Sequence, residues 1–155
     1  MKKIIVGVLL GLMLSQPITA HAQCEIYPRT HDVKMNVNEF SYEEAQMLMQ
    51  IAEAEAGNQG SDGMWLVMSV VYNRRDSEEF PESIKEVIFQ DNQFYTKGMG
   101  VTEISPECHE ALARIEKGDV APEIVAFEKS TSNSLDSFFS CAFEYRDHNF
   151  YTLKK

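Results

Sequence analysis

Apolar side chains recur with helical spacing from residue 41 onward, behind a sequence that favours a helix start. Ser41 followed by Glu44 is a capping-box pair, which satisfies free backbone amides at the beginning of a helix. Gly57 is typical of a position just past a helix end. Positions spaced three or four apart share one face of a helix, and here they are Leu48, Ile51, Ala52 and Glu55.

Two carboxylates near the end of this predicted helix are expected in different surroundings. Glu53 is two residues from Glu55, which is about 200° around the helix axis. We therefore expect Glu55 to point with the apolar face and Glu53 to point to water.

Three further helices are predicted. One over about 61–75 is apolar on nearly every side across 65–72, which is typical of a helix buried in the middle of a domain. Phe80-Pro81 is expected to open a short helix, and a last helix is predicted over 105–118. The polar segment 90–100 is a predicted loop with room for a short strand.

Alternating positions replace helical spacing toward the C-terminus, which predicts strands. One strand is expected over 124–127, and a second over 139–145, where apolar side chains occupy every other position. Asp147-His148-Asn149 is the expected turn into a returning strand over 150–153. The pattern as a whole predicts an α+β fold that is mainly α, with a small antiparallel hairpin or sheet near the C-terminus.

The first 22 residues have the three parts of a secretory signal peptide. Lys2 and Lys3 precede an apolar run over 4–14, and Ala20-His21-Ala22 matches a small-residue cleavage site. A membrane-spanning helix needs roughly 20 apolar residues, more than this run supplies. We expect cleavage after residue 22, and then a secreted or periplasmic protein that is not inserted in the membrane.

Two alternatives to cleavage remain, a retained anchor and a lipoprotein acylated at Cys24. The residue before Cys24 is Gln23, where a lipoprotein signal has a small residue. After the leader we expect a lead-in over 23–40 and one domain over 41–155.

Charge and cysteine content limit the partners, disulfides and metal sites that we expect. The chain has 14 Lys+Arg and 24 Asp+Glu, a net charge of −10, and without Lys2 and Lys3 the balance is 12 against 24, or −12. Such a surface repels phosphate backbones, so no nucleic-acid partner is expected. Three cysteines in an exported chain allow one disulfide, for which we predict Cys108–Cys141. No spacing of cysteines and histidines suggests a zinc site, and neither metal nor cofactor is expected.

Glu55 has the surroundings that an acid catalyst of glycoside cleavage requires. Such a catalyst keeps its proton near neutral pH, whereas an ordinary Glu titrates near about 4.3. An apolar face and the negative end of a helix dipole both disfavour the charged carboxylate, so both should raise the pKa of Glu55. The alternative is an ordinary interfacial residue at a fraying helix end.

Four short motifs follow one another between residues 48 and 94, and a fifth lies near the end of the chain. In order they are Ala54-Glu55-Ala56 with Asn58-Gln59; Gly63 with Val70-Val71-Tyr72-Asn73-Arg74; Phe80-Pro81 with Ile84, Val87, Ile88 and Gln90; Gln93-Phe94; and Asp147-His148-Asn149-Phe150-Tyr151. In this order and spacing they resemble the SleB-type cell-wall hydrolase family, which includes the catalytic domain of spore-cortex-lytic enzymes.

The resemblance implies a lysozyme-like fold related to lytic transglycosylases, with peptidoglycan glycan strands as the substrate. The family's single catalytic Glu corresponds to Glu55, which would protonate the glycosidic oxygen and then accept a proton from the sugar's own 6-hydroxyl. No second carboxylate is needed on that route. We expect a monomer whose substrate-binding residues are Gln59, Asn73, Gln93, Phe94, Tyr95, His148 and Tyr151.

The chain also departs from the family pattern. Gln59 stands where many relatives carry a Glu, which keeps hydrogen bonding and loses the charge, and the region 97–137 matches weakly. The single Trp is Trp65, expected in the core. Three alternatives stay open: a hydrolytic muramidase in which Glu55 activates water, a non-catalytic peptidoglycan-binding module of the same fold, and an unrelated small secreted adaptor.

Overall fold

The computed structural model describes residues 25–26, 40–100 and 103–155. The predicted leader lies outside the described residues, as does the predicted lead-in apart from 25–26 and Phe40. The elements, in chain order, are β1 (Glu25–Ile26), α1 (Tyr42–Ala56), α2 (Gly60–Arg75), α3 (Ile84–Ile88), the 3₁₀ helix η1 (Thr96–Gly98), α4 (Pro106–Glu116), β2 (Ile124–Lys129), β3 (Phe139–Tyr145) and β4 (His148–Leu153).

Serine side chains set the starts of three helices. Ser41 caps α1 through the predicted box, its Oγ accepting from the Glu44 amide while the Glu44 carboxylate accepts from the Ser41 amide. Ser105 caps α4, as predicted. Ser83 caps α3, so this helix begins at Ile84 and the predicted start at Phe80-Pro81 is wrong. A side-chain acceptor for the Glu86 amide decided the boundary, and Pro81 lies in the irregular segment before the helix.

The sheet has the strand order β1-β3-β4-β2. β4 is antiparallel to both β2 and β3, and the short β1 is parallel to β3. The β3–β4 turn is made by Arg146 and Asp147, with φ of 49° at Arg146. His148 and Asn149 therefore already belong to β4, so the predicted turn at 147–149 began one residue late. Of the loop 90–100, the part with regular structure is η1, and the short strand allowed there does not form.

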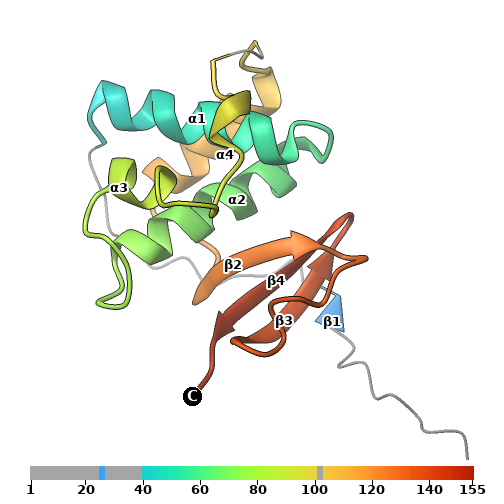
Figure 1. Cartoon of the computed structure of the whole chain (residues 1–155). Helices are drawn as coiled ribbons and strands as arrows, with labels where there is room; N and C mark the ends of the chain where they lie inside the picture. The colour runs from blue at the N-terminus through green and yellow to red at the C-terminus, as the bar shows by residue number, and fades with distance from the viewer. Residues whose placement is uncertain (1–24, 27–39, 101–102) are drawn as a thin grey trace, which may run out of the picture.

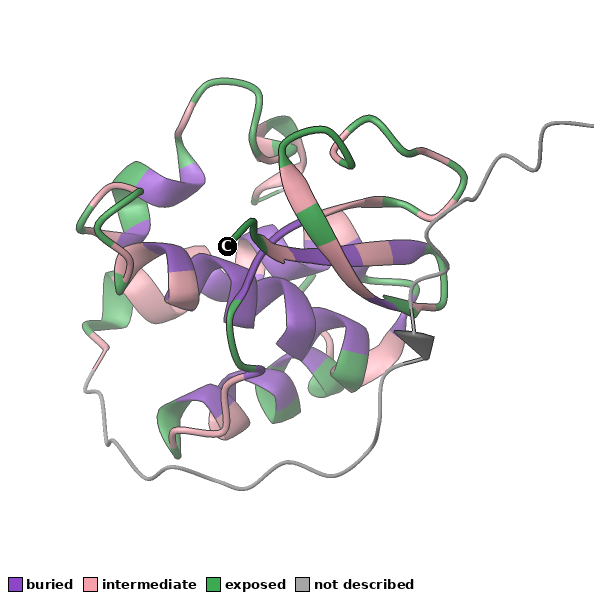
Figure 2. Cartoon of the chain, turned by 90° about the horizontal axis from the view of Figure 1, so that it is seen from below, coloured by how far each residue is buried: buried purple, intermediate pink, exposed green. Residues whose placement is uncertain are grey.

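α2 is the centre of the molecule. Every residue from Gly63 to Tyr72 is buried, because α1, α3, α4 and β2 all pack against this helix. Figure 1 shows the helices gathered on one side of the sheet, with β2 the strand nearest to them, and Figure 2 shows the buried residues concentrated in the middle. The predicted α+β class is confirmed. In the described part of the chain, no helix has the length and apolar character of a membrane span.

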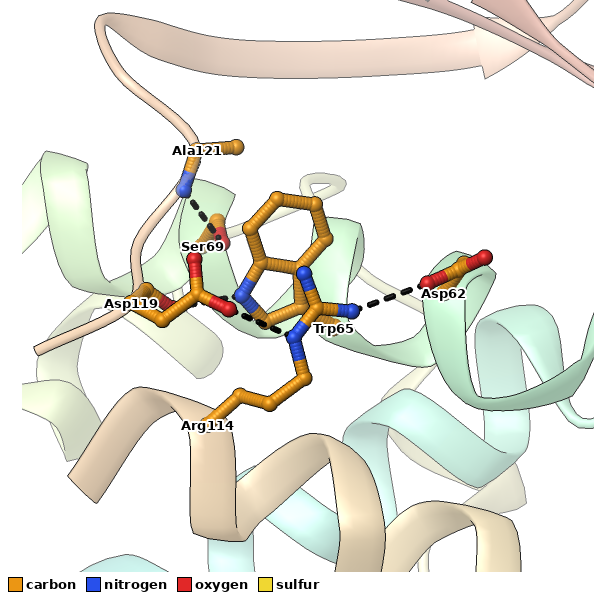
Figure 3. A network of polar contacts seen from close by, with 6 residues as sticks. All are labelled: Asp62, Trp65, Ser69, Arg114, Asp119 and Ala121. Carbon is orange, nitrogen blue, oxygen red and sulfur yellow. Dashed lines mark hydrogen bonds and ion pairs between the residues drawn. The ribbon is translucent and has the colours of Figure 1, made fainter. Parts of the chain in front are cut away.

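Trp65 joins α2 to α4 and to the segment that leads into β2. The indole is 1% exposed, and its Nε1 donates to the Asp119 carbonyl oxygen at 2.6 Å. Figure 3 shows the Arg114 guanidinium over the ring, 3.7 Å from its centroid, with ion pairs to Asp62 at 2.9 Å and Asp119 at 2.6 Å. The prediction that Trp65 belongs to the core is confirmed.

The predicted Cys108–Cys141 disulfide is wrong. Cys108 is a free thiol with no exposed surface, and it points at α1, where its Sγ donates to the Met49 carbonyl oxygen at 3.5 Å. Burial, with a smaller contribution from Glu53, raises the pKa of this thiol to about 12. Cys141 is disulfide-bonded, and its partner lies outside the described residues.

Candidate active site

Glu55 lies in the last turn of α1, at the wall of a pocket of about 520 Å³. The carboxylate is partly exposed, and its Oε1 accepts a hydrogen bond from the backbone amide of Tyr95, 40 residues further along the chain. The loop before η1 therefore holds the carboxylate in place. The pocket is lined by Ala54, Glu55, Gln93, Tyr95, Phe127, Glu128, Lys129 and His148.

The pKa of Glu55 is raised above its ordinary value. Burial is the main cause, and the hydrogen bond from the Tyr95 amide opposes it because that donor favours the ionised carboxylate. The direction agrees with what the apolar face of the helix predicts. A carboxyl group that keeps its proton to higher pH is suited to donate that proton to a leaving oxygen.

Tyr95 presents an aromatic ring at the rim of the pocket. The residue is 59% exposed although it is aromatic. A Cβ at Gly98 would lie 2.8 Å from two carbons of this ring, so the ring lies directly against the glycine of η1. The absence of a side chain at Gly98 allows this position, and the ring face suits contact with the apolar side of a sugar.

Arg74 supports the pocket through Gln93. The side chain is nearly buried, its Nε donates to the Val125 carbonyl oxygen, and its Nη1 donates to Gln93 Oε1 at 3.0 Å. Its guanidinium carbon lies 4.9 Å from the ring centroid of Phe80 and 5.2 Å from that of Phe94. Burial lowers the pKa of Arg74 to about 10, so it remains a cation at neutral pH.

Gln59 and His148 form a buried pair at the back of the pocket. Gln59 Nε2 lies 2.9 Å from His148 Nδ1. With the Gln59 amide in this orientation, Nδ1 is the acceptor and a neutral His148 carries its proton on Nε2, whereas the reversed amide would pair with the other tautomer. Burial lowers the pKa of His148, Lys129 lowers it further and Asp147 acts in the opposite direction. His148 lines the pocket directly, whereas Gln59 acts through it.

Glu128 is a pocket residue that the sequence did not reveal. Its carboxylate accepts hydrogen bonds from Tyr151 Oη at 2.7 Å, Ser132 Oγ at 2.6 Å, Ser134 Oγ at 2.6 Å, and the Ser134 and Leu135 amides, both at 3.2 Å. Burial acts to raise its pKa, but these donors outweigh it and hold the value at about 2. Glu128 is therefore an ionised group whose acceptor sites are all in use.

The other predicted residues lie behind the pocket or away from it. Phe94 packs against Phe127, with ring centroids 6.0 Å apart, and Tyr151 is fully buried below Glu128. The Asn73 amide donates to the carbonyl oxygens of Ala121 at 2.8 Å and Ile124 at 2.9 Å. Asn73 borders a separate hollow of about 450 Å³ near the C-terminus. Four predicted residues thus line the pocket, namely Glu55, Gln93, Tyr95 and His148.

Glu53 does not face water, contrary to the sequence-based expectation. It is 8% exposed, and its Oε1 accepts hydrogen bonds from Ser105 Oγ and from the Ser105 amide, the latter at 2.7 Å. A Cβ at Gly57 would lie 2.9 Å from Glu53 Oε2, so both carboxylate oxygens are enclosed. The side of α1 opposite Glu55 is covered by the start of α4, which the spacing within one helix did not indicate.

The described residues contain no group of three or more His, Cys, Asp or Glu side chains that would hold a metal ion. The residues that line the pocket offer an acid with a raised pKa, a neutral histidine, an amide, an aromatic face, a lysine ammonium group and an anion fixed by hydrogen bonds.

The chain belongs to the cell wall hydrolase family, whose model matches residues 58–151. Glu55 precedes the matched range by three residues. No curated protein matches the sequence significantly.

Two solved structures share the fold. One is the catalytic domain of the Bacillus cereus SleB protein, with a TM-score of 0.65, 18% identity, and 74% of this chain and 94% of that one covered. The other is the catalytic domain of the germination-specific lytic transglycosylase SleB from Bacillus anthracis, with a TM-score of 0.64, 18% identity and coverage of 74% and 98%. The predicted resemblance to the SleB-type family is confirmed.

Proposed function

We propose that this protein is a peptidoglycan-degrading enzyme that cleaves the glycan strand, with Glu55 as its general acid. The observation that carries the proposal is a carboxyl group with a raised pKa at the wall of a 520 Å³ pocket, positioned by the Tyr95 amide. Family membership supports the substrate class. A secreted or periplasmic location follows from this substrate and from the predicted leader.

We further propose the lytic transglycosylase route, because neither nearby carboxylate is free to act as a second catalyst. Glu53 is enclosed by Ser105 and Gly57, and the oxygens of Glu128 are occupied by five donors. Glu55 would give its proton to the glycosidic oxygen as the C1–O bond breaks. The resulting carboxylate would take the proton of the 6-hydroxyl while that oxygen bonds to C1, which restores the acid and yields an anhydro sugar.

The other pocket residues supply substrate contacts in this proposal. The Tyr95 ring would contact the apolar side of a sugar, and Gln93 and His148 offer polar groups in the same pocket. Gln59, Phe94 and Tyr151 support these residues from behind, and Asn73 has a structural role in a different part of the molecule.

Digestion of purified peptidoglycan, followed by mass analysis of the fragments, tests the proposal. Wild-type protein should release fragments with anhydro ends, which are one water lighter than the products of a muramidase. Glu55→Gln should lower the rate by about 10² to 10⁴-fold. Glu110→Gln, the same change at an exposed position of α4, is the matched control and should leave the rate unchanged. Wild-type turnover in Glu55→Gln would remove Glu55 from the mechanism, and products one water heavier would identify a hydrolase.

A further inference from the structure

The contact between Arg74 and Gln93 determines which end of the Gln93 amide faces the pocket. A guanidinium group has five N–H donors and no acceptor. The atom of Gln93 that lies 3.0 Å from Arg74 Nη1 must therefore be the carbonyl oxygen. The amide nitrogen is the end left over, and it forms no hydrogen bond with any residue that the structure describes.

This orientation is held by a rigid support. Arg74 is 4% exposed and is enclosed by the rings of Phe80 and Phe94 and by the Val125 carbonyl oxygen. Turning the Gln93 amide over would bring an NH₂ group against the buried cation, so that two donors faced each other. A buried donor left without its acceptor is strongly disfavoured. The free end of the Gln93 amide is therefore its NH₂ group, with two N–H donors, while the carbonyl oxygen is engaged by Arg74.

We propose that Gln93 is a specificity-determining residue that donates a hydrogen bond to the carbonyl oxygen of an acetamido group on the glycan, with Arg74 as its positioning residue. This inference rests on the proposed function. An NH₂ group donates and does not accept, so its best partner is a strong acceptor. Among the acceptor-only groups of an N-acetylated glycan, the amide carbonyl oxygen is a stronger acceptor than the ring and bridging oxygens.

Lys129 and Tyr95 also bring donors to the pocket, an ammonium group and a phenol hydroxyl, but no hydrogen bond from a described residue fixes either of them, whereas Arg74 fixes Gln93. The Tyr95 amide is used by Glu55, and Glu128 only accepts. His148 pairs with Gln59 through Nδ1, so only its other ring nitrogen is available to a substrate. Gln93 lies two residues before Tyr95, so an acetamido group bound there would belong to a sugar next to the Glu55 carboxyl group.

Gln93→Glu separates this role from a structural one. The new carboxylate still accepts from Arg74, and now with an opposite charge, so the protein should melt at the wild-type temperature or higher. The pocket, however, loses its donor and gains an acceptor. Asn92→Asp makes the same chemical change one residue away, at an exposed position with φ of 60°, which Asp tolerates. It controls for the added negative charge.

Binding to insoluble peptidoglycan, measured by sedimentation in the Glu55→Gln background, gives the decisive comparison. On fully N-acetylated polymer, Gln93→Glu should raise Kd about tenfold or more relative to Asn92→Asp. On chemically de-N-acetylated polymer, whose freed amines are ammonium groups that a carboxylate attracts, Gln93→Glu should bind at least as tightly as Asn92→Asp. Gln93→Met, which removes the donor without adding charge, should raise Kd on the N-acetylated polymer only. Equal binding of Gln93→Glu and Asn92→Asp to N-acetylated polymer would overturn the inference, as would an equal loss on both polymers. The binding result does not depend on cleavage, so a wild-type protein that fails to cut would overturn the proposed function separately.

Discussion

At the level of the single residue, two opposing effects act on the pKa of Glu55, and their balance predicts the pH dependence of activity. Burial raises its pKa and the Tyr95 amide lowers it, with burial the larger effect. As a general acid, Glu55 is active when protonated, so kcat should fall as pH rises through this raised pKa, above the ordinary value of about 4.3. Initial rates on peptidoglycan between about pH 3 and pH 8 measure this limb. A fall centred at or below the ordinary value would contradict the assignment.

The same pKa has a consequence for stability. A carboxyl group whose pKa is raised on folding binds its proton more tightly in the native state, so its stabilising contribution is present at low pH. That contribution is lost as pH rises through the folded pKa, and at pH 7 the ionised group opposes folding. Glu55→Gln should therefore melt at or above the wild-type temperature at pH 7. A clearly lower melting temperature would mean that the ionised carboxylate is a structural acceptor for Tyr95.

Glu53 and Glu55 show what residue spacing can predict about the surroundings of a single side chain, and what it cannot. Spacing within one helix correctly separates the two directions, because it depends on local geometry alone. It does not say what covers each direction, and α4, which covers Glu53, begins about 50 residues later. Glu128 escaped prediction for a related reason, since its ionised state depends on a loop and on Tyr151 from another strand.

At the level of the elements, Glu53 joins α1 to the first turn of α4. Its carboxylate accepts from the Ser105 amide and hydroxyl, close to the positive end of the α4 dipole, where an anion is stabilised. Glu53→Gln keeps an acceptor and loses the charge, and should destabilise the protein by about 1 kcal/mol. Urea unfolding with Glu110→Gln as the control measures the difference. A variant as stable as its control would show that the charge has no structural role.

The first turn of α2 has no room for a side chain at Gly63, which explains the glycine in this motif. A Cβ there would lie 2.4 Å from the Cβ of Gln59, a backbone-anchored atom that has little room to move. Gly63→Ala should therefore destabilise by about 1–3 kcal/mol, although Ala is the better helix former. It should also displace Gln59 from His148 and lower kcat. Thermal melting and rate measurements check both effects, and Ser61→Ala, in the same turn, is the control. A Gly63→Ala protein with raised stability would exclude the packing argument.

Helix starts were predictable where the capping residue and its partner lie within one turn, as for Ser41 and Ser105. Two such signals compete at the third helix, and Ser83 outweighs Pro81 because it supplies an acceptor whereas proline only tolerates the first-turn geometry. The strands were predictable from alternation, and the end of the hairpin shifted by one residue because Arg146 adopts positive φ.

At the level of the whole molecule, the site is assembled from four separated parts of the chain: the end of α1, the loop before η1, the end of β2 and the start of β4. Motif order indicated three of these parts, since Glu55, Gln93 and His148 each lie in a family-like motif. The end of β2 lies in the segment that matches the family weakly. Its contribution follows from the antiparallel pairing of Lys129 with His148, which no local pattern indicates.

The net charge of the protein gives the last prediction. The chain without Lys2 and Lys3 carries −12, and one basic residue, Lys129, lines a pocket that also holds Glu55 and Glu128. Peptidoglycan carries carboxylates on its stem peptides, so protein and substrate repel each other over distances of about one Debye length, which is roughly 10 Å at 0.1 M salt. Screening should therefore raise kcat/KM a few-fold between about 20 mM and 200 mM NaCl. Peptidoglycan whose carboxylates have been amidated is the control and should show no such rise. A rate that falls with salt would instead mean that local attraction at Lys129 outweighs the charge of the whole molecule.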